Sequence, residues 1–267
     1  MAILTLATRL LRESDGFRVD TGQLALDAPL PAGASVELAL HAGARLYAVP
    51  EPAAFRLILE AEGAGMAALA WTGVHLGFGA EARYRYTHSF ANDIALDVLL
   101  RRFFAHARLP EQLESPMADG ESIALSYGGY LRLAASASAG TEAEATLHAG
   151  IAGHFSVAVT PDRDQPGWVR VLVRRQRGAA IGVAADVKVE ASSEDAAEVW
   201  NMALHAGYSR STMQDALLDI CLNLTTAHGR QAMAAAGRGD FVPALCHADP
   251  DSVRLNEGVF ARRTQAQ

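Results

Sequence analysis

The sequence is short of lysine and cysteine and has no long apolar run. Lys188 is the only lysine, so arginine supplies all the other strongly basic side chains. Cys221 and Cys246 are too few for a disulfide framework and lack the spacing of a zinc site, which favours reduced thiols and a cytoplasmic protein. No stretch reaches the ~18 consecutive apolar residues of a membrane-spanning helix. The apolar start of the chain lacks the flanks of a cleaved signal peptide, and we expect none.

Motifs that carry catalysis are also missing. The sequence has no nucleophile elbow, no phosphate-binding loop and no dinucleotide-binding fingerprint. Cys246 and His247 are adjacent, but neighbouring residues of a strand point to opposite faces, so they are poorly placed to activate each other. We therefore expect no catalytic residues and no cofactor, and we favour a protein that is not an enzyme.

The charge of the chain bears on its partners. A net charge of −7 counts against a nucleic-acid partner, because such a partner requires a positive surface. Half of the 267 residues are hydrophobic and a fifth are charged, which is typical of a globular protein with one or two domains. The arginines are scattered along the chain, which favours a bias in composition over selection for anion binding.

Alternation of apolar and other residues dominates the first two thirds of the chain. It is clearest over residues 36–48, 66–86 and 123–159, and it returns over residues 169–189. A period of two is typical of half-buried strands. Because few helices separate these segments, they predict an antiparallel sheet rather than alternating strands and helices.

Helical spacing interrupts this alternation in two regions. Residues 92–107 carry an apolar stripe that begins near a candidate N-cap, Asn92. Near the C-terminus, two capping-box spacings precede residues 196–207 and 215–229, which we expect to be helical. A short helix is predicted to follow over residues 230–237.

These patterns together predict an α+β protein. We expect a large antiparallel β-sheet, folded as a sandwich or a partly closed barrel, with one internal helix and a C-terminal helical region. Residues 1–191 are predicted to be the strand-rich part, with the inserted helix near 92–108. Residues 192–267 are predicted to be the helical region packed on it, as one structural unit, with a last strand over 253–260.

Histidines are the candidates for a metal site. His148 and His154 share the same parity of neighbouring predicted strands, and His75 lies on another long strand. If these strands pair, two or three of the imidazoles could meet and hold a metal ion. No helical metal-binding spacing is present, so we favour isolated polar residues and no metal.

Arginines near the start of the last long alternating segment are candidate contacts for a partner or an anion. Arg170 and Arg174 share one parity of the predicted strand, and Arg175 and Arg177 share the other. Closely spaced arginines can form bidentate contacts with anions. They can equally protect an exposed sheet edge, which is the interpretation that we prefer.

The hairpin predicted over residues 131–151 is rich in alanine, serine and threonine. One face would carry Leu131, Leu133, Leu147 and Ile151, and it would have the length of a membrane-inserting hairpin. Small side chains also let a second layer pack closely. We prefer the packed sheet, because this face is weakly apolar and no aromatic girdle brackets both of its ends.

Three hypotheses of function follow from the sequence. We favour a non-enzymatic structural or protein-interaction module that associates with a protein partner or with itself. The alternative is a membrane-active or pore-forming β protein that uses the hairpin at residues 131–151. A further alternative is an enzyme or small-ligand carrier, with a site between sheet faces around Tyr84, Tyr86, His75 and His148.

Overall fold

The protein folds as a nine-stranded antiparallel sheet in which every strand pairs with its neighbours in sequence. This is seen in a computed structural model that describes residues 17–30, 34–71, 73–139, 143–191, 200–240, 245 and 249–266. Within those residues the edges of β1 and β9 are unpaired. The expected α+β architecture is confirmed. The sheet is open, however, and is not folded into the sandwich or partly closed barrel that we expected.

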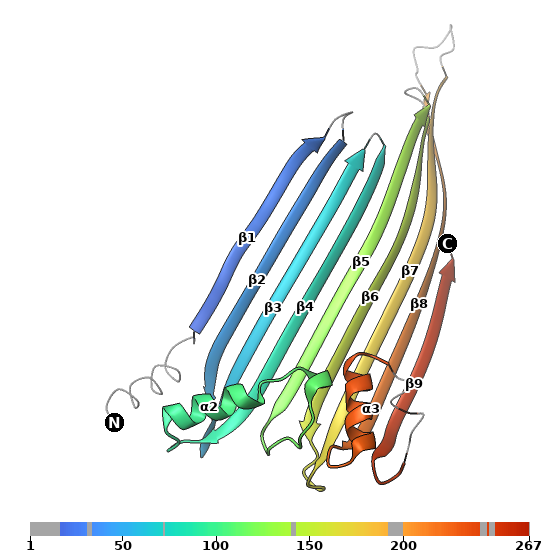
Figure 1. Ribbon diagram of the computed structural model, residues 1–267. Coiled ribbons are helices and arrows are strands. Elements are labelled where there is room, and N and C mark those ends of the chain that lie inside the picture. The colour runs from blue at the N-terminus through green and yellow to red at the C-terminus, as the bar shows by residue number, and fades with distance from the viewer. Residues whose placement is uncertain are drawn as a thin grey trace.

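The strands are long because the apolar alternation continues for many residues, and the prolines of β1, β2 and β6 (Pro29, Pro50 and Pro161) lie at or next to the strand ends. Figure 1 shows them side by side, with successive strands running in opposite directions. Their bounds are β1 (Phe17–Leu30), β2 (Ala34–Pro50), β3 (Ala54–Trp71), β4 (Val74–Ala91), β5 (Ser122–Ala139), β6 (Ala143–Pro161), β7 (Trp168–Ala191), β8 (Trp200–Asn223) and β9 (Val253–Ala266).

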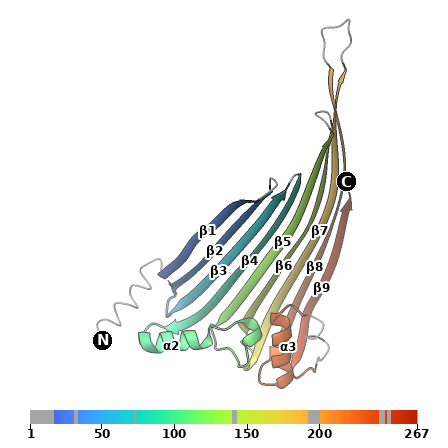
Figure 2. The same ribbon diagram turned by 45° about the horizontal axis from the view of Figure 1, so that its top comes forward.

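The helices gather at one end of the sheet (Figure 1). They are α2 (Leu96–His106), the short 3-10 helix η2 (Pro110–Gln112) and α3 (Ala227–Gly237). Thr226 caps α3, because its hydroxyl accepts a hydrogen bond from the backbone N–H of Gly229 at 3.0 Å. Beyond the helices the strands continue as a single layer, as the turned view shows (Figure 2).

The register assigns each residue to one of two faces, because directly paired residues point to the same side. One row, for example, joins Leu69, Leu76, Leu133, Ala149 and Ile181 on five successive strands. We call this side the apolar face and the other the polar face. The strand side chains described on the apolar face include no aspartate or glutamate.

The hydrophobic core lies between the helices and the apolar face. Phe103 of α2 is fully buried, and its ring centroid lies 4.8 Å from that of Tyr86 on β4. Met233 of α3 is also fully buried. After α3 the backbone at Gly239 approaches Phe155 so closely that a Cβ would lie 2.6 Å from its ring. The helices therefore cover the apolar face at this end only.

The C-terminal part differs from our expectation. Residues 200–223 belong to strand β8, so the helices predicted over 196–207 and 215–229 are wrong for every described residue before Ala227. The helix predicted over 230–237 is confirmed as the second half of α3, and the strand predicted over 253–260 is confirmed as part of β9. The inserted helix is also confirmed, but Ala95, and not Asn92, is its N-cap.

Candidate functional site

No described residue covers the apolar face over the half of the sheet away from the helices. The large apolar side chains on this half of the face are between 37% and 66% exposed. The residues that alternate with them in sequence point to the polar face. We call this region the apolar band. It comprises Leu24, Leu26, Leu38, Leu40, Leu69, Trp71, Val74, Leu76, Phe78, Leu131, Leu133, Leu147, Ile151, Ile181 and Val183.

Exposed aromatic side chains stand at the two ends of this band. Trp71 lies at the β3–β4 turn, and Tyr127 lies on β5 where the helix-covered region begins. Trp71 pairs with Val74, which pairs with Ala135, so the two aromatic rows are eight residues apart along β5. At ~3.4 Å per residue this spacing is about 27 Å. A single exposed aromatic residue thus stands at each end of the band, and both residues lie outside the hairpin at 131–151.

The hairpin predicted over residues 131–151 is present. Leu131 pairs with Ile151, Leu133 with Ala149, and Leu147 with Ala135, all on the apolar face. These side chains continue the rows of β3 and β4 on one side and of β7 on the other. The hairpin is therefore one part of a wider apolar surface and is not an isolated element.

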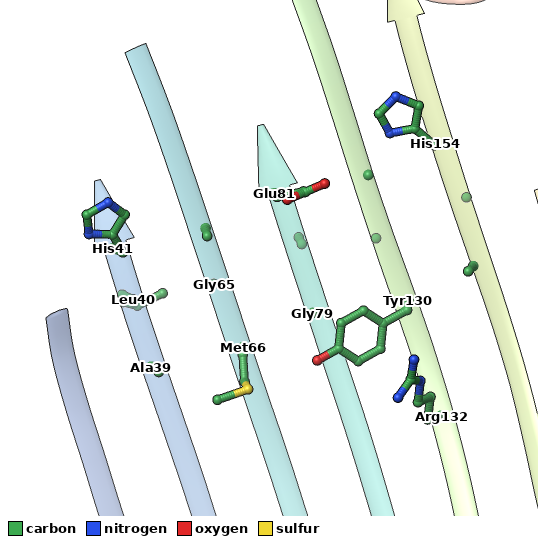
Figure 3. Close-up of a pocket in the computed structure, with 16 residues that line it drawn as sticks. Ala39, Leu40, His41, Gly65, Met66, Gly79, Glu81, Tyr130, Arg132 and His154 are labelled. Carbon is green, nitrogen blue, oxygen red and sulfur yellow. The ribbon is translucent and has the colours of Figure 1, made fainter. Parts of the chain in front are cut away.

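The polar face is hollowed. One hollow of about 620 Å³ is lined by residues of β2 to β6, including His41, Glu81 and His154 (Figure 3). In Figure 3 the ring of Tyr130 on β5 reaches toward β4. A Cβ at Gly79 would lie 2.4 Å from this ring, so glycine is required for the ring to lie there. A second hollow of about 660 Å³ lies closer to the helical end.

Ion pairs span neighbouring strands of the polar face near the helical end. Arg170 donates from Nε to Asp219 Oδ1 at 3.0 Å, and Arg174 donates from Nη2 to Asp215 Oδ2, also at 3.0 Å. The hydrogen bonds from Arg170 hold the pKa of Asp219 below its ordinary value. The predicted anion contacts at Arg170 and Arg174 are therefore engaged within the sheet.

The other two arginines of that group lie on the opposite side of β7. Arg175 and Arg177 belong to the apolar face, because they pair across β6 with Phe155 and Gly153. Along β7 they are followed by Ala179 and then by Ile181, the first band residue on this strand. The four arginines that the sequence grouped together are thus divided between two faces.

The candidate metal ligands do not converge. His75 and His148 share a row of the polar face but are separated by the intervening strand at Ala134. His154 lies six residues along β6 from His148, about 20 Å away. In the described part of the chain no group of three histidine, cysteine or acidic side chains could hold a metal ion.

The enzyme or carrier site that we considered is also not assembled. Tyr84 and Tyr86 lie on the apolar face near the helices, whereas His75 and His148 lie on the polar face near the far end. Cys221 is half-buried on the polar face of β8 and accepts a hydrogen bond from Asn256. Cys246 lies outside the described residues.

A buried polar cluster ties α2 to the sheet, and the sequence did not reveal it. Glu121, which is 4% exposed, accepts a hydrogen bond from the backbone N–H of Ala118 at 2.7 Å. His88 of β4 and His106 of α2 each place Nδ1 3.0 Å from Glu121 Oε1. These residues are 15 to 33 positions apart in sequence, so only the fold brings them together.

Within the described residues no helix is both long and apolar enough to cross a membrane. The chain is recognised by none of the protein-family models, and no curated protein or solved structure matches it.

Proposed function

We propose that the protein acts at lipid bilayers, with the apolar band in contact with lipid and the polar face toward water. The observation that carries this proposal is the uncovered apolar band on a single-layered sheet. Proteins that stay monomeric in water rarely expose a continuous apolar patch of more than a few hundred Å². A band that extends over seven strands therefore requires something to cover it.

The dimensions of the band favour lipid as the cover. The band takes nine residues of β5, from Tyr127 to Ala135 in the row of Trp71, and a membrane strand tilted by ~45° takes ~9–11 residues, with aromatic residues at both borders. The opposite face of the same segments carries small and polar side chains such as Ser136, Thr146 and His148. Apolar residues on one side and polar residues on the other are typical of strands that separate lipid from water.

The staggered turns give independent support. Ser35 of β2 pairs with Ala70 of β3, one residue before the end of β3, and so the β1–β2 and β3–β4 turns lie level. β5 then continues four residues beyond the β3–β4 turn, and β7 continues four beyond the β5–β6 turn. These eight residues correspond to ~27 Å along the strand direction, and the β1–β2 and β7–β8 turns are six strand spacings of ~4.8 Å apart across the sheet. A plane through the turns would thus tilt the strands by roughly 43°, which is within the range of membrane strands, ~35–45°.

Flotation with vesicles tests the proposal. We expect the purified protein to float with phosphatidylcholine vesicles, and dye release in the same sample to report whether the bilayer is breached. Replacing Ile151 or Leu147 with glutamate should weaken vesicle binding by about tenfold, because a charged side chain on the lipid face costs ~2–4 kcal/mol for arginine or lysine at the bilayer midplane and less for glutamate.

Neighbouring residues on the polar face provide matched controls. Ala152→Glu and His148→Glu introduce the same side chain one position away, on the opposite face. These variants should float as the unaltered protein does, and circular dichroism should show the same strand content in all four. Equal loss of flotation in both sets, or no flotation of the unaltered protein, would contradict lipid contact.

Self-association is the second candidate function, and the two free edges favour it. β1 carries Pro29 and a register shift between Asp20 and Gln23, which are features that discourage edge pairing. β9 has no proline, although its pairing with β8 shifts register at Asn256, and Val259 and Phe260 are exposed on it. If the apolar band is covered by a second copy instead of lipid, the protein will run as a stable dimer in solution and will not float.

A further inference from the structure

The described strand residues of the apolar face include four arginines but no lysine, aspartate or glutamate. They are Arg175 and Arg177 on β7, Arg210 on β8 and Arg262 on β9. Arg177 and Arg262 share one row on either side of Gln214. Arg210 pairs with Ile181, level with the apolar band, so we define the arginine group as Arg175, Arg177 and Arg262, which lie closer to the helices.

The group lacks carboxylate partners within the described residues. Arg174, the neighbour of Arg175 on the polar face, has an ion pair with Asp215 at 3.0 Å. No aspartate or glutamate of the described strands lies on the side to which Arg175, Arg177 and Arg262 point. Guanidinium groups without a protein partner remain available for phosphate or carboxylate oxygens, which they bind bidentately.

The position of the group is the second observation. Arg175, Arg177 and Arg262 line one hollow of about 310 Å³ together with the exposed Phe260 and with Asp215, whose carboxylate pairs with Arg174. The next position on β7 toward the band is Ala179, followed by Ile181. Toward the helices, the face is closed by the buried Val173. The arginines thus stand at the border between the helix-covered part and the apolar band.

We infer that the arginine group binds the phosphate groups of anionic lipids at the surface of the bilayer that the apolar band contacts. This inference rests on the proposed function, because it assigns the lipid class at the border of the same face. When the band lies in hydrocarbon, its border lies at the depth of the headgroups, where arginine both reaches phosphate and keeps contact with water. Phe260 beside the arginines supplies an apolar contact at the same level.

Vesicles that differ only in charge test the inference. Flotation is measured with phosphatidylcholine vesicles and with vesicles that contain phosphatidylglycerol in addition. We expect the unaltered protein to bind the anionic vesicles more tightly. The triple variant Arg175→Gln, Arg177→Gln and Arg262→Gln should lose at least about tenfold of that preference, since each basic residue near an anionic surface contributes ~1 kcal/mol.

A triple variant on the polar face is the control for net charge. Arg83→Gln, Arg132→Gln and Arg263→Gln remove the same charge, and Arg263 lies next to Arg262 with its side chain on the opposite face. This control should keep the preference for anionic vesicles. Equal loss in both triple variants, or no loss in the first, would overturn the assignment to the arginine group.

The outcomes separate the two proposals. Equal binding of both vesicle types by the unaltered protein overturns the lipid class and leaves lipid contact standing. Flotation with neither type overturns both. Glycerol 3-phosphate added to the anionic vesicles distinguishes the source of the phosphate: release of the protein at submillimolar concentration would show a site for a soluble phosphate ester, and no release supports the headgroup.

Discussion

The hydroxyl of Tyr86 donates a hydrogen bond to Glu121 Oε1 at 2.8 Å, and neither side chain is exposed to solvent by more than a few per cent. Tyr86 comes from the apolar face of β4, and Glu121 from the segment that leads into β5. His106 adds α2 to the same carboxylate. One buried acid thus joins the helical end to the sheet.

Replacing Glu121 with glutamine should lower the free energy of unfolding by about 1–3 kcal/mol, because buried hydrogen-bonding groups lose their partner. Burial alone would raise the pKa of Glu121, but hydrogen bonds from His88, the backbone of Ala118 and Tyr86 lower it below the ordinary 4.5. A depressed pKa stabilises the fold above pH 4.5, and this contribution is lost as the pH falls through the lower value. Urea unfolding between pH 3 and pH 7 measures both effects.

The variant should therefore lose most stability at neutral pH and approach the unaltered protein under acid conditions. A variant that differs from the unaltered protein by the same amount at every pH would show that Glu121 acts without its charge.

Phe103 and Phe104 give a matched pair on α2. Phe103 is fully buried against Tyr86 and Phe90, whereas Phe104 is 54% exposed. Phe103→Ala should cost about 3–5 kcal/mol in unfolding free energy, because it leaves a cavity under the helix. Phe104→Ala should change stability by less than about 1 kcal/mol. Similar costs for the two variants would show that α2 does not pack on the sheet through Phe103.

Gly79 and Gly77 differ in what a side chain would meet on the polar face of β4. A Cβ at Gly79 would lie 2.4 Å from the ring of Tyr130, whereas one at Gly77 would meet nothing within 4 Å. Gly79→Ala should destabilise the protein by about 1 kcal/mol through displacement of the ring. The cost should vanish in a Tyr130→Ala background, as a double-mutant cycle by urea unfolding would reveal. Gly77→Ala should be neutral or stabilising.

Asp219 and Asp215 should respond differently to the loss of their arginine partners. Asp219 is 4% exposed and also accepts a hydrogen bond from Asn256, whereas the side chain of Asp215 is one third exposed. Arg170→Ala should therefore lower the free energy of unfolding measurably, because it leaves the buried Asp219 carboxylate without its charged partner. Arg174→Ala should lower it less, because solvent screens the exposed ion pair. Thermal or urea unfolding of the two variants makes the comparison, and an equal cost would contradict it.

Alternation in the sequence predicted the antiparallel sheet, but it did not predict that residues 200–223 form a strand. Leu217, Ile220 and Leu224 recur at helical spacing, and they predicted a helix. The same segment also contains Leu218, Ile220 and Leu222, all fully buried on one face of β8. Apolar residues at both odd and even positions are compatible with the helical period and with the strand period. Pairing with β7 and β9 makes this segment a strand.

The candidate site was only partly predictable for a related reason. Alternation identified Leu131, Leu133, Leu147 and Ile151 as one face of a hairpin, because their pairing is local. Whether another layer covers that face depends on where the helices dock, which alternation does not encode. The division of the arginines could be foreseen from parity alone, but the approach of Arg262 to Arg177 required the order of the strands.

Because β1 and β9 are the two edges of the described sheet, insertion into a bilayer should depend on how many molecules insert together. Along each of these edges, backbone N–H and C=O groups face outward without a strand partner, and in hydrocarbon each unsatisfied group would cost several kcal/mol. A single molecule embedded to the depth of its band would carry that penalty on both sides, whereas adjoining molecules would share and remove it. Bilayer entry by this sheet should therefore be cooperative, with a steep dependence on protein concentration.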